Sequence, residues 1–137
     1  MKKNNYKKIF ICATEQSGDN IGSGVMNELL KNDPNLIFDG VGGSKMSSFF
    51  NNKINDIKDF KSMGVIEIIF SIKKYIKILK NLSHIINENN YDLIITIDSP
   101  DFNYPLAKKI RKKNPNKKII HIVAPSVWAW REGRAEK

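Results

Sequence analysis

Four short apolar segments, each followed by a polar or glycine-rich turn, constrain the fold of this chain more than any other feature of its sequence. They occupy residues 8–13, 36–41, 93–97 and 118–123. Runs of Ile, Val, Leu and Phe that do not alternate with polar residues are typical of strands buried on both faces, as in a parallel sheet. The segments therefore predict a sheet that helices cover on both sides.

The stretches between these segments have helical periodicity. Apolar residues recur at three- and four-residue spacing within 19–31, 66–82 and 104–113, and a short helix is expected over 45–50. The first helix is expected to begin near Asp19 or Asn20. Residues 51–61 are polar and irregular, which predicts a connecting loop with a short edge strand. The alternation predicts an α/β fold with a right-handed, doubly wound parallel sheet, in one domain over residues 1–137.

The net charge is +9, with 23 lysines and arginines against 14 aspartates and glutamates. Such a charge suits nucleic acid, an anionic membrane or phosphorylated ligands, or lysines that merely solvate the surface. The lysines are scattered over several predicted elements and no aromatic-basic RNA motif is present. No nucleic-acid partner is therefore expected.

The single cysteine, Cys12, lies inside an apolar run, so neither a disulfide framework nor a cysteine-based zinc site is expected. No spacing of His, Cys and carboxylates indicates a metal centre. The apolar run near the N-terminus is too short for a signal peptide, and no stretch has the length of a membrane-spanning helix. These observations favour a cytoplasmic location.

Chemistry is expected where the strands end, because ligands of parallel sheets bind beyond the carboxyl ends of the strands. Asp98 follows the apolar run 93–97 directly and is the candidate general base, since a carboxylate there can accept a proton from a sugar hydroxyl. Asp101 and Asn103 have an alternative role as caps of a helix that begins near Tyr104. For Asp101 the capping role is favoured. Its expected contribution to the site is to support Asp98.

Three further loops are expected at the same edge, over residues 14–19, 40–44 and 125–131. The glycines of the first two suit either a ligand loop or a tightly packed turn. Trp128 and Trp130 form either a lid or a core plug, and Arg131 either meets phosphate or begins a solvated helix. His121 alternates with isoleucines within a strand, which favours a hydrogen-bonded core histidine over a catalytic one.

The long helix over residues 66–82 has two interpretations. Its apolar face is expected to comprise Ile69, Ile72, Ile76 and Leu79, with lysines opposite, as for a helix that packs on a sheet. Further apolar residues gather near its N-terminal end, beyond what one core face requires. An apolar cluster beside lysines also suits reversible contact with an anionic bilayer.

Five motifs together resemble the N-terminal half of the bacterial lipid-A-disaccharide synthase family, in the same order. They are SGDNIG at 17–22, GVGG at 40–43, MG at 63–64, IDSPDFN at 97–103 and PSVWAWR at 125–131. The resemblance implies a Rossmann-like N-terminal domain of an inverting glycosyltransferase of the two-Rossmann-domain (GT-B) type, with no metal or cofactor. It implies UDP-2,3-diacylglucosamine as donor and 2,3-diacylglucosamine 1-phosphate as acceptor, in the cytoplasm at the surface of the inner membrane.

Carried onto this sequence, the resemblance assigns Asp98 as the base for the 6-hydroxyl of the acceptor. The residues it implies for substrate binding are Glu15, Ser17, Gly18, Asp19, Gly42, Gly43, Asn103, Ser126, Trp128 and Arg131. The residues it implies for the acyl-chain and membrane patch are Met63, Val65, Ile66, Ile69 and Phe70.

The chain stops at Lys137, where that family continues into a second domain that binds the UDP sugar. The donor half is therefore expected to be absent from this chain, which is expected to be inactive by itself. Three origins of the short chain are considered: a fragment, one half of a split enzyme that works with a separate C-terminal chain, and a decayed remnant. The alternative function is a non-catalytic module that binds lipid or membrane.

Overall fold

The computed structural model describes residues 7–61 and 65–123, and for residues 65–70 it describes the helical backbone alone. Five parallel strands form one sheet in the order β3-β2-β1-β4-β5. The strands are β1 (Lys8–Ala13), β2 (Ile37–Gly42), β3 (Asn52–Asp56), β4 (Leu93–Ile97) and β5 (Ile119–Ile122). The helices are α1 (Gln16–Asn32), α2 (Ser44–Ser47), η1 (Ile57–Phe60), α3 (Val65–Glu88) and α4 (Pro100–Lys113).

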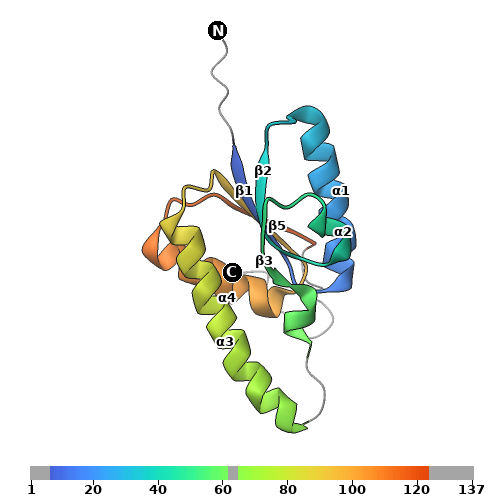
Figure 1. Ribbon diagram of the computed structural model, residues 1–137. Coiled ribbons are helices and arrows are strands. Elements are labelled where there is room, and N and C mark those ends of the chain that lie inside the picture. The colour runs from blue at the N-terminus through green and yellow to red at the C-terminus, as the bar shows by residue number, and fades with distance from the viewer. Residues whose placement is uncertain (1–6, 62–64, 124–137) are drawn as a thin grey trace.

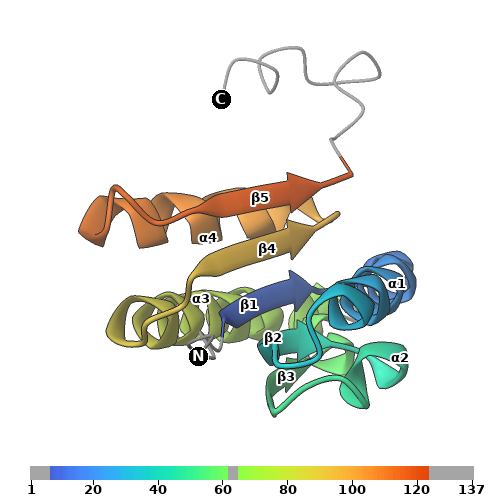
Figure 2. The same cartoon turned by 90° about the horizontal axis from the view of Figure 1, so that it is seen from above.

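Helices cover both faces of this sheet, with α1 and α2 on one side and α3 and α4 on the other (Figures 1 and 2). Strand β1 shows why its residues from Ile9 to Ala13 are all apolar. Ile9, Ile11 and Ala13 join the core beneath α1 and α2, whereas Phe10 and Cys12 join the core beneath α3 and α4. The prediction of an α/β fold with a doubly wound parallel sheet is confirmed.

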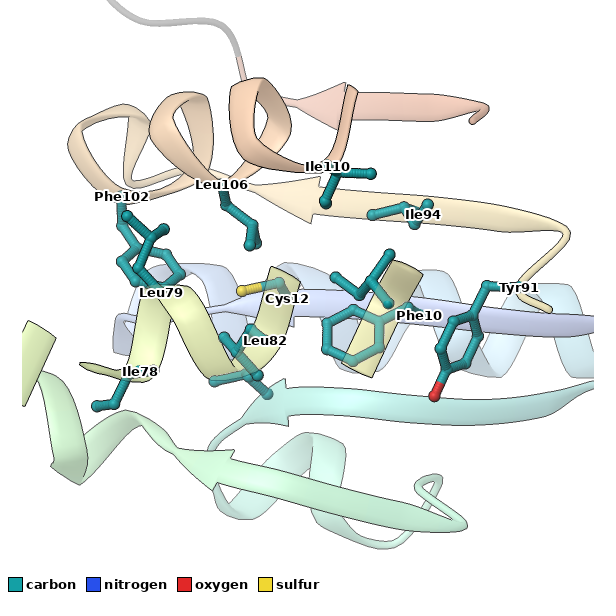
Figure 3. Packing of buried hydrophobic residues seen from close by; sticks show 12 residues of the cluster. Phe10, Cys12, Ile78, Leu79, Leu82, Tyr91, Ile94, Phe102, Leu106 and Ile110 are labelled. Carbon is teal, nitrogen blue, oxygen red and sulfur yellow. The ribbon is translucent and has the colours of Figure 1, made fainter. Parts of the chain in front are cut away.

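The core beneath α3 and α4 is dense with apolar side chains from both helices and the sheet (Figure 3). Phe10 meets Tyr91 edge to face at a ring-centroid distance of 5.3 Å. Leu82, Ile86, Leu106 and Ile110 are fully buried against these strands. Burial of such side chains is the main term that stabilises the sheet.

The order of the strands reverses between β1 and β4. From β1 the chain moves outward to β2 and β3, and then returns through α3 to place β4 on the other side of β1. The helices that follow β1 and β4 therefore run on opposite faces of the sheet. This switch point is where a ligand site is expected in an open parallel sheet.

Two helices begin earlier than the sequence predicted. Helix α1 begins at Gln16, not near Asp19 or Asn20, because Gly18 is packed within the first turn instead of forming a turn before the helix. Helix α4 begins at Pro100, not near Tyr104, with Ser99 as its N-cap residue. Proline suits the first helical turn because it needs no backbone N–H there. Asp101 and Asn103 therefore lie inside α4, and the predicted capping role is wrong.

The buried face of α3 also differs from the prediction. Ile72 and Ile76 are 54% and 44% exposed, although both were expected to face the sheet. The residues of α3 that pack in the core are Tyr75, Ile78, Leu79, Leu82, Ile85 and Ile86. The helix is rotated relative to the predicted face because α4 packs beside it, which the periodicity of one helix does not reveal.

Strand β5 is the outer strand on one side of the described sheet, and it is only partly buried. Ile120 is 50% exposed, so the prediction of a buried strand is wrong for this segment. Within the ranges that the structure describes, no helix has the length and apolar character needed to cross a membrane.

Candidate active site

Asp98 lies at the switch point, in a turn whose backbone is strained. Asp98 and Ser99 have φ angles of 53° and 43°, in the left-handed region that non-glycine residues seldom adopt. Such a conformation costs about 1–3 kcal/mol and persists only where surrounding contacts enforce it. Strained residues of this kind gather at functional sites, so the turn marks Asp98 as a candidate on geometry alone.

Hydrogen bonds hold this turn from both sides. The backbone N–H of Asp98 donates to the carbonyl of Ile122 at 2.9 Å. The buried side chain of Asn103 donates from Nδ2 to the carbonyls of Asp98, at 2.8 Å, and Ile97, at 3.2 Å. Asn103, predicted as a substrate-binding residue, therefore supports the backbone beneath the candidate base.

The carboxylate of Asp98 is partly exposed and has one side-chain partner among the described residues. Ser17 Oγ, in the first turn of α1, donates to Asp98 Oδ2 at 2.8 Å. Ser17 reaches this position because Gly18 next to it sits directly on the sheet. A Cβ at Gly18 would lie 3.0 Å from Ala13 Cβ and 3.4 Å from the carbonyl oxygen of Ile97.

Asp19 connects the first loop to the second. Its fully buried carboxylate accepts from the backbone N–H groups of Gly43 at 2.7 Å, Met46 at 3.0 Å and Lys45 at 3.1 Å. It thus satisfies the free N–H groups at the start of α2, where negative charge also complements the helix dipole. The structure assigns Asp19 a partner within the chain, and its predicted contact with substrate stays a prediction.

Gly42 and Gly43 complete this second loop. A Cβ at Gly43 would lie 2.7 Å from the carboxylate of Asp19, and a Cβ at Gly42 would lie 2.7 Å from the sulfur of Met46. Gly43 therefore allows close packing against Asp19, and Gly42 allows close packing against Met46. Glu15, the N-cap residue of α1, is exposed at the same edge and makes no side-chain capping bond. Three of the four predicted loops are thus brought together here.

A histidine lies beside this edge on β5. His121 is paired with Thr96 of β4 in the sheet register, and its Nδ1 is 2.8 Å from Thr96 Oγ1. Burial lowers the pKa of His121, and a backbone hydrogen bond at Val123 and the charge of Asp98 oppose this shift. The predicted hydrogen-bonded histidine is confirmed, although it is half-buried at an outer strand and not in the core.

An apolar groove of about 430 Å³ opens next to the start of α4. Tyr75 spans it, because its hydroxyl donates to the backbone carbonyl of Asp101. Burial and the charge of Asp101 raise the pKa of Tyr75, so the hydroxyl stays protonated as a donor. The residues that line the groove are Asp59, Phe60, Ser71, Ile72, Tyr75, Ile76 and Asp101.

Sequence reasoning missed this groove because it placed Ile72 and Ile76 in the core. The signal available was an excess of apolar residues in the N-terminal part of α3, more than one face of a helix can bury. Among the residues that the structure describes, no three His, Cys, Asp or Glu side chains are grouped as a metal site requires.

Several predicted site residues cannot be placed. Ser126, Trp128, Arg131 and Met63 lie outside the described residues. The remaining patch residues belong to the described helical backbone of α3, but their side chains are not described; they are Val65, Ile66, Ile69 and Phe70.

The fold and the site together define a Rossmann-like α/β domain that presents a hydrogen-bonded carboxylate at the switch point of its sheet. The sequence profile of the lipid-A-disaccharide synthetase family matches residues 9–137, and the chain belongs to this family. The resemblance inferred from the five motifs is thereby confirmed.

Curated relatives carry the same name. The chain is 48% identical over 131 residues to a lipid-A-disaccharide synthase of Rickettsia typhi, a match that covers 94% of the chain and 34% of the relative. It is 41% identical over 134 residues to that of Idiomarina loihiensis, with 98% and 35% covered. It is 35% identical over 133 residues to that of Nitrobacter hamburgensis, with 96% and 34% covered. The chain thus spans about a third of the length of these relatives and corresponds to their N-terminal part.

Proposed function

We propose that this chain is the acceptor-binding part of a lipid-A-disaccharide synthase. The reaction transfers 2,3-diacylglucosamine from UDP to the 6-hydroxyl of 2,3-diacylglucosamine 1-phosphate, with inversion at the anomeric carbon. The observation that carries the proposal is the position of Asp98 at the switch point of the sheet, where α1 contacts its carboxylate and α4 and β5 hold its backbone. Membership of the family supports the choice of reaction.

In the proposed mechanism Asp98 is the general base. As the 6-hydroxyl oxygen attacks the anomeric carbon of the donor, its O–H bond breaks and the proton passes to the carboxylate of Asp98. The bond between the anomeric carbon and UDP breaks, and UDP leaves with the electron pair. A positioned base of this kind contributes about 10²–10⁴-fold to a rate. We propose that the UDP-sugar site belongs to the part of the enzyme that corresponds to the remaining two thirds of the relatives.

The acyl chains of the acceptor are proposed to lie over the N-terminal part of α3. The groove between Phe60, Ile72 and Ile76 supports this placement, because it is apolar, open and adjacent to the turn that carries Asp98. The groove and the patch that the sequence predicts from Met63 to Phe70 are proposed to touch the inner membrane from the cytoplasmic side. This groove also favours the second candidate function, a lipid-binding module without catalysis.

The catalytic proposal is tested by reconstitution. The chain is mixed with the C-terminal two thirds of the Rickettsia typhi relative, and disaccharide formation from labelled acceptor is measured. Product is expected from the mixture, and Asp98→Ala is expected to lower the rate at least about 100-fold. Asp92→Asn is the matched control, since Asp92 is an exposed carboxylate at the opposite end of β4. Full activity in Asp98→Ala would remove Asp98 as the base.

The two candidate functions separate in the same experiment. If the wild-type mixture forms no disaccharide while the chain alone binds acyl-sugar acceptor, the catalytic proposal fails and the lipid-binding module is retained. If the chain alone binds no acceptor, the lipid-binding module fails as well.

A further inference from the structure

The two oxygens of the Asp98 carboxylate are not equivalent. Oδ2 accepts a hydrogen bond from Ser17 Oγ at 2.8 Å. Oδ1 accepts none from the residues that the structure describes. Because the backbone N–H and carbonyl of Asp98 are also bonded, to Ile122 and Asn103, little freedom is left except rotation of the side chain. Within the described part of the chain, the hydrogen bond from Ser17 restricts this rotation.

We propose that Ser17 is a positioning residue that orients Asp98 so that Oδ1 receives the proton of the attacking hydroxyl. This inference rests on the proposed role of Asp98 as the base, and it changes the expected role of Ser17. The sequence suggested that Ser17 lines the substrate site, whereas the structure directs its hydroxyl to the carboxylate.

The position of Ser17 follows from the packing of its neighbour. Gly18 brings the first turn of α1 within contact distance of Ala13 and the carbonyl of Ile97, the residue before Asp98. A larger residue at position 18 would push this turn away from β4 and lengthen the contact with Asp98. Ser17 itself is exposed, so its hydroxyl makes no contribution to the core. Removal of the Ser17 hydroxyl therefore tests the orientation of Asp98 without disturbing the core.

The test uses the reconstituted mixture and separates kcat from the KM for the acceptor. Ser17→Ala is expected to lower kcat about tenfold with KM unchanged, because one hydrogen bond to a charged group is lost near the transition state. Ser17→Thr keeps the hydroxyl and is expected to restore most of kcat. Ser23→Ala is the matched control on the same helix, since Ser23 Oγ bonds only the carbonyl of Asn20.

A second comparison uses the Asp98→Ala background. There Ser17→Ala is expected to have no further effect on the residual rate, because Ser17 acts through Asp98. A rise in KM with kcat unchanged would make Ser17 a substrate-binding residue and overturn the inference. Equal losses in both backgrounds would also overturn it. Either result leaves the proposed function intact as long as Asp98→Ala alone inactivates the mixture.

The contact is also measurable without activity. Urea unfolding of the free chain, as wild type, Ser17→Ala, Asp98→Ala and the double variant, gives the coupling between the two side chains. Each substitution is expected to raise the unfolding equilibrium constant. The product of the two single-variant increases is expected to exceed the increase in the double variant by about fivefold. Additive effects would show that the two side chains do not interact, whatever the outcome of the reconstitution.

Discussion

Single residues at the carboxyl edge divide into those that build the loops and those that remain available for chemistry. Asp19 is structural, because its buried carboxylate accepts hydrogen bonds from three backbone N–H groups and joins α1 to the start of α2. Asp98 is available, because its carboxylate is partly exposed and Ser17 is its side-chain partner. In the sequence, Asp19 follows a glycine and Asp98 follows an apolar strand, and neither pattern tells a structural aspartate from a catalytic candidate. The surroundings of each side chain in the structure separate the two roles.

Removal of the Asp19 carboxylate is expected to destabilise the whole domain. Asp19→Ala leaves buried N–H groups at Gly43 and Met46 without an acceptor, so the free energy of unfolding is expected to fall by about 2–3 kcal/mol. Urea denaturation followed by circular dichroism measures this change. Asn20→Ala, at the exposed neighbouring position, is the control and is expected to change stability by no more than about 0.5 kcal/mol. Equal stability of the two variants would contradict the capping role of Asp19.

His121 predicts how stability changes with pH. Burial holds its pKa in the folded chain below the ordinary value of 6.5. As the pH falls below that value, the unfolded chain binds a proton at this side chain that the folded chain does not bind. Stability contributed by neutral His121 is therefore present above pH 6.5 and is lost as the pH falls from there towards the lower folded value. Side-chain hydrogen bonds from Lys53 and Asn55 lower the pKa values of Asp56 and Asp59, respectively. The stability that these two carboxylates contribute is therefore lost only at more acidic pH.

The measurement is urea unfolding at pH 7.5 and pH 5.5. Wild type is expected to be less stable at pH 5.5, and His121→Gln is expected to show a smaller difference between the two values. His84→Gln provides the control, because His84 is the other histidine of the chain and is exposed. An unchanged pH dependence in His121→Gln would show that another group is responsible.

At the scale of elements, α3 decides which surface is core and which is groove. Its periodicity alone allows several apolar faces, since isoleucines occur on nearly every side of the helix. Packing against α4 and the sheet selects the face around Leu79 and Leu82, and leaves Ile72 and Ile76 at the groove. The groove therefore exists because this helix carries more apolar surface than its core contacts cover.

A pair of truncations tests this orientation. Leu82 is fully buried, so Leu82→Ala is expected to lower the free energy of unfolding by about 2–5 kcal/mol. Ile72 is 54% exposed, so Ile72→Ala is expected to cost less than about 1 kcal/mol. Both values come from denaturant unfolding of the free chain. A larger loss for Ile72→Ala than for Leu82→Ala would favour the face predicted from the sequence.

At the scale of the whole molecule, positive charge is concentrated on one side. Helices α3 and α4 contain nine of the 23 lysines and arginines but only three of the 14 acidic residues. Both helices cover the same face of the sheet (Figure 2). Much of the net charge of +9 therefore lies on the side that also carries the apolar groove. Charge next to exposed apolar groups is the arrangement that binds an anionic bilayer reversibly.

This asymmetry predicts salt-sensitive membrane binding. The chain is expected to sediment with vesicles that contain anionic phospholipid at low salt, and to dissociate as added salt shortens the screening length. Ile66→Asp, Phe70→Asp and Ile72→Asp are each expected to weaken binding at least severalfold, because each replaces an apolar residue of the proposed membrane patch and groove with a charge. Asn27→Asp makes the same change of charge on α1, across the sheet, and is the control. Absence of binding at low salt, or equal weakening by Asn27→Asp, would contradict the membrane surface proposed here.

Much of the fold follows from the sequence, since apolar runs without alternation require burial on both faces and the helices between them supply the cover. The strand ends also place Asp98 at the correct edge. The start of α4 and the buried face of α3 do not follow, because each depends on a neighbour that is distant along the chain. Ser17 and Asp98 are 81 residues apart, and their contact requires β1 and β4 to be adjacent.

By itself, then, the sequence determined the class of fold, the family and the candidate base, because each depends on local pattern or on motifs that are continuous in the chain. The tertiary structure alone decided which carboxylate oxygen of Asp98 the Ser17 hydroxyl contacts, which aspartate is structural and which isoleucines form a groove. Those properties depend on packing between elements, where one close approach, that of Gly18 to the end of β4, places the hydroxyl of Ser17 on the carboxylate of Asp98.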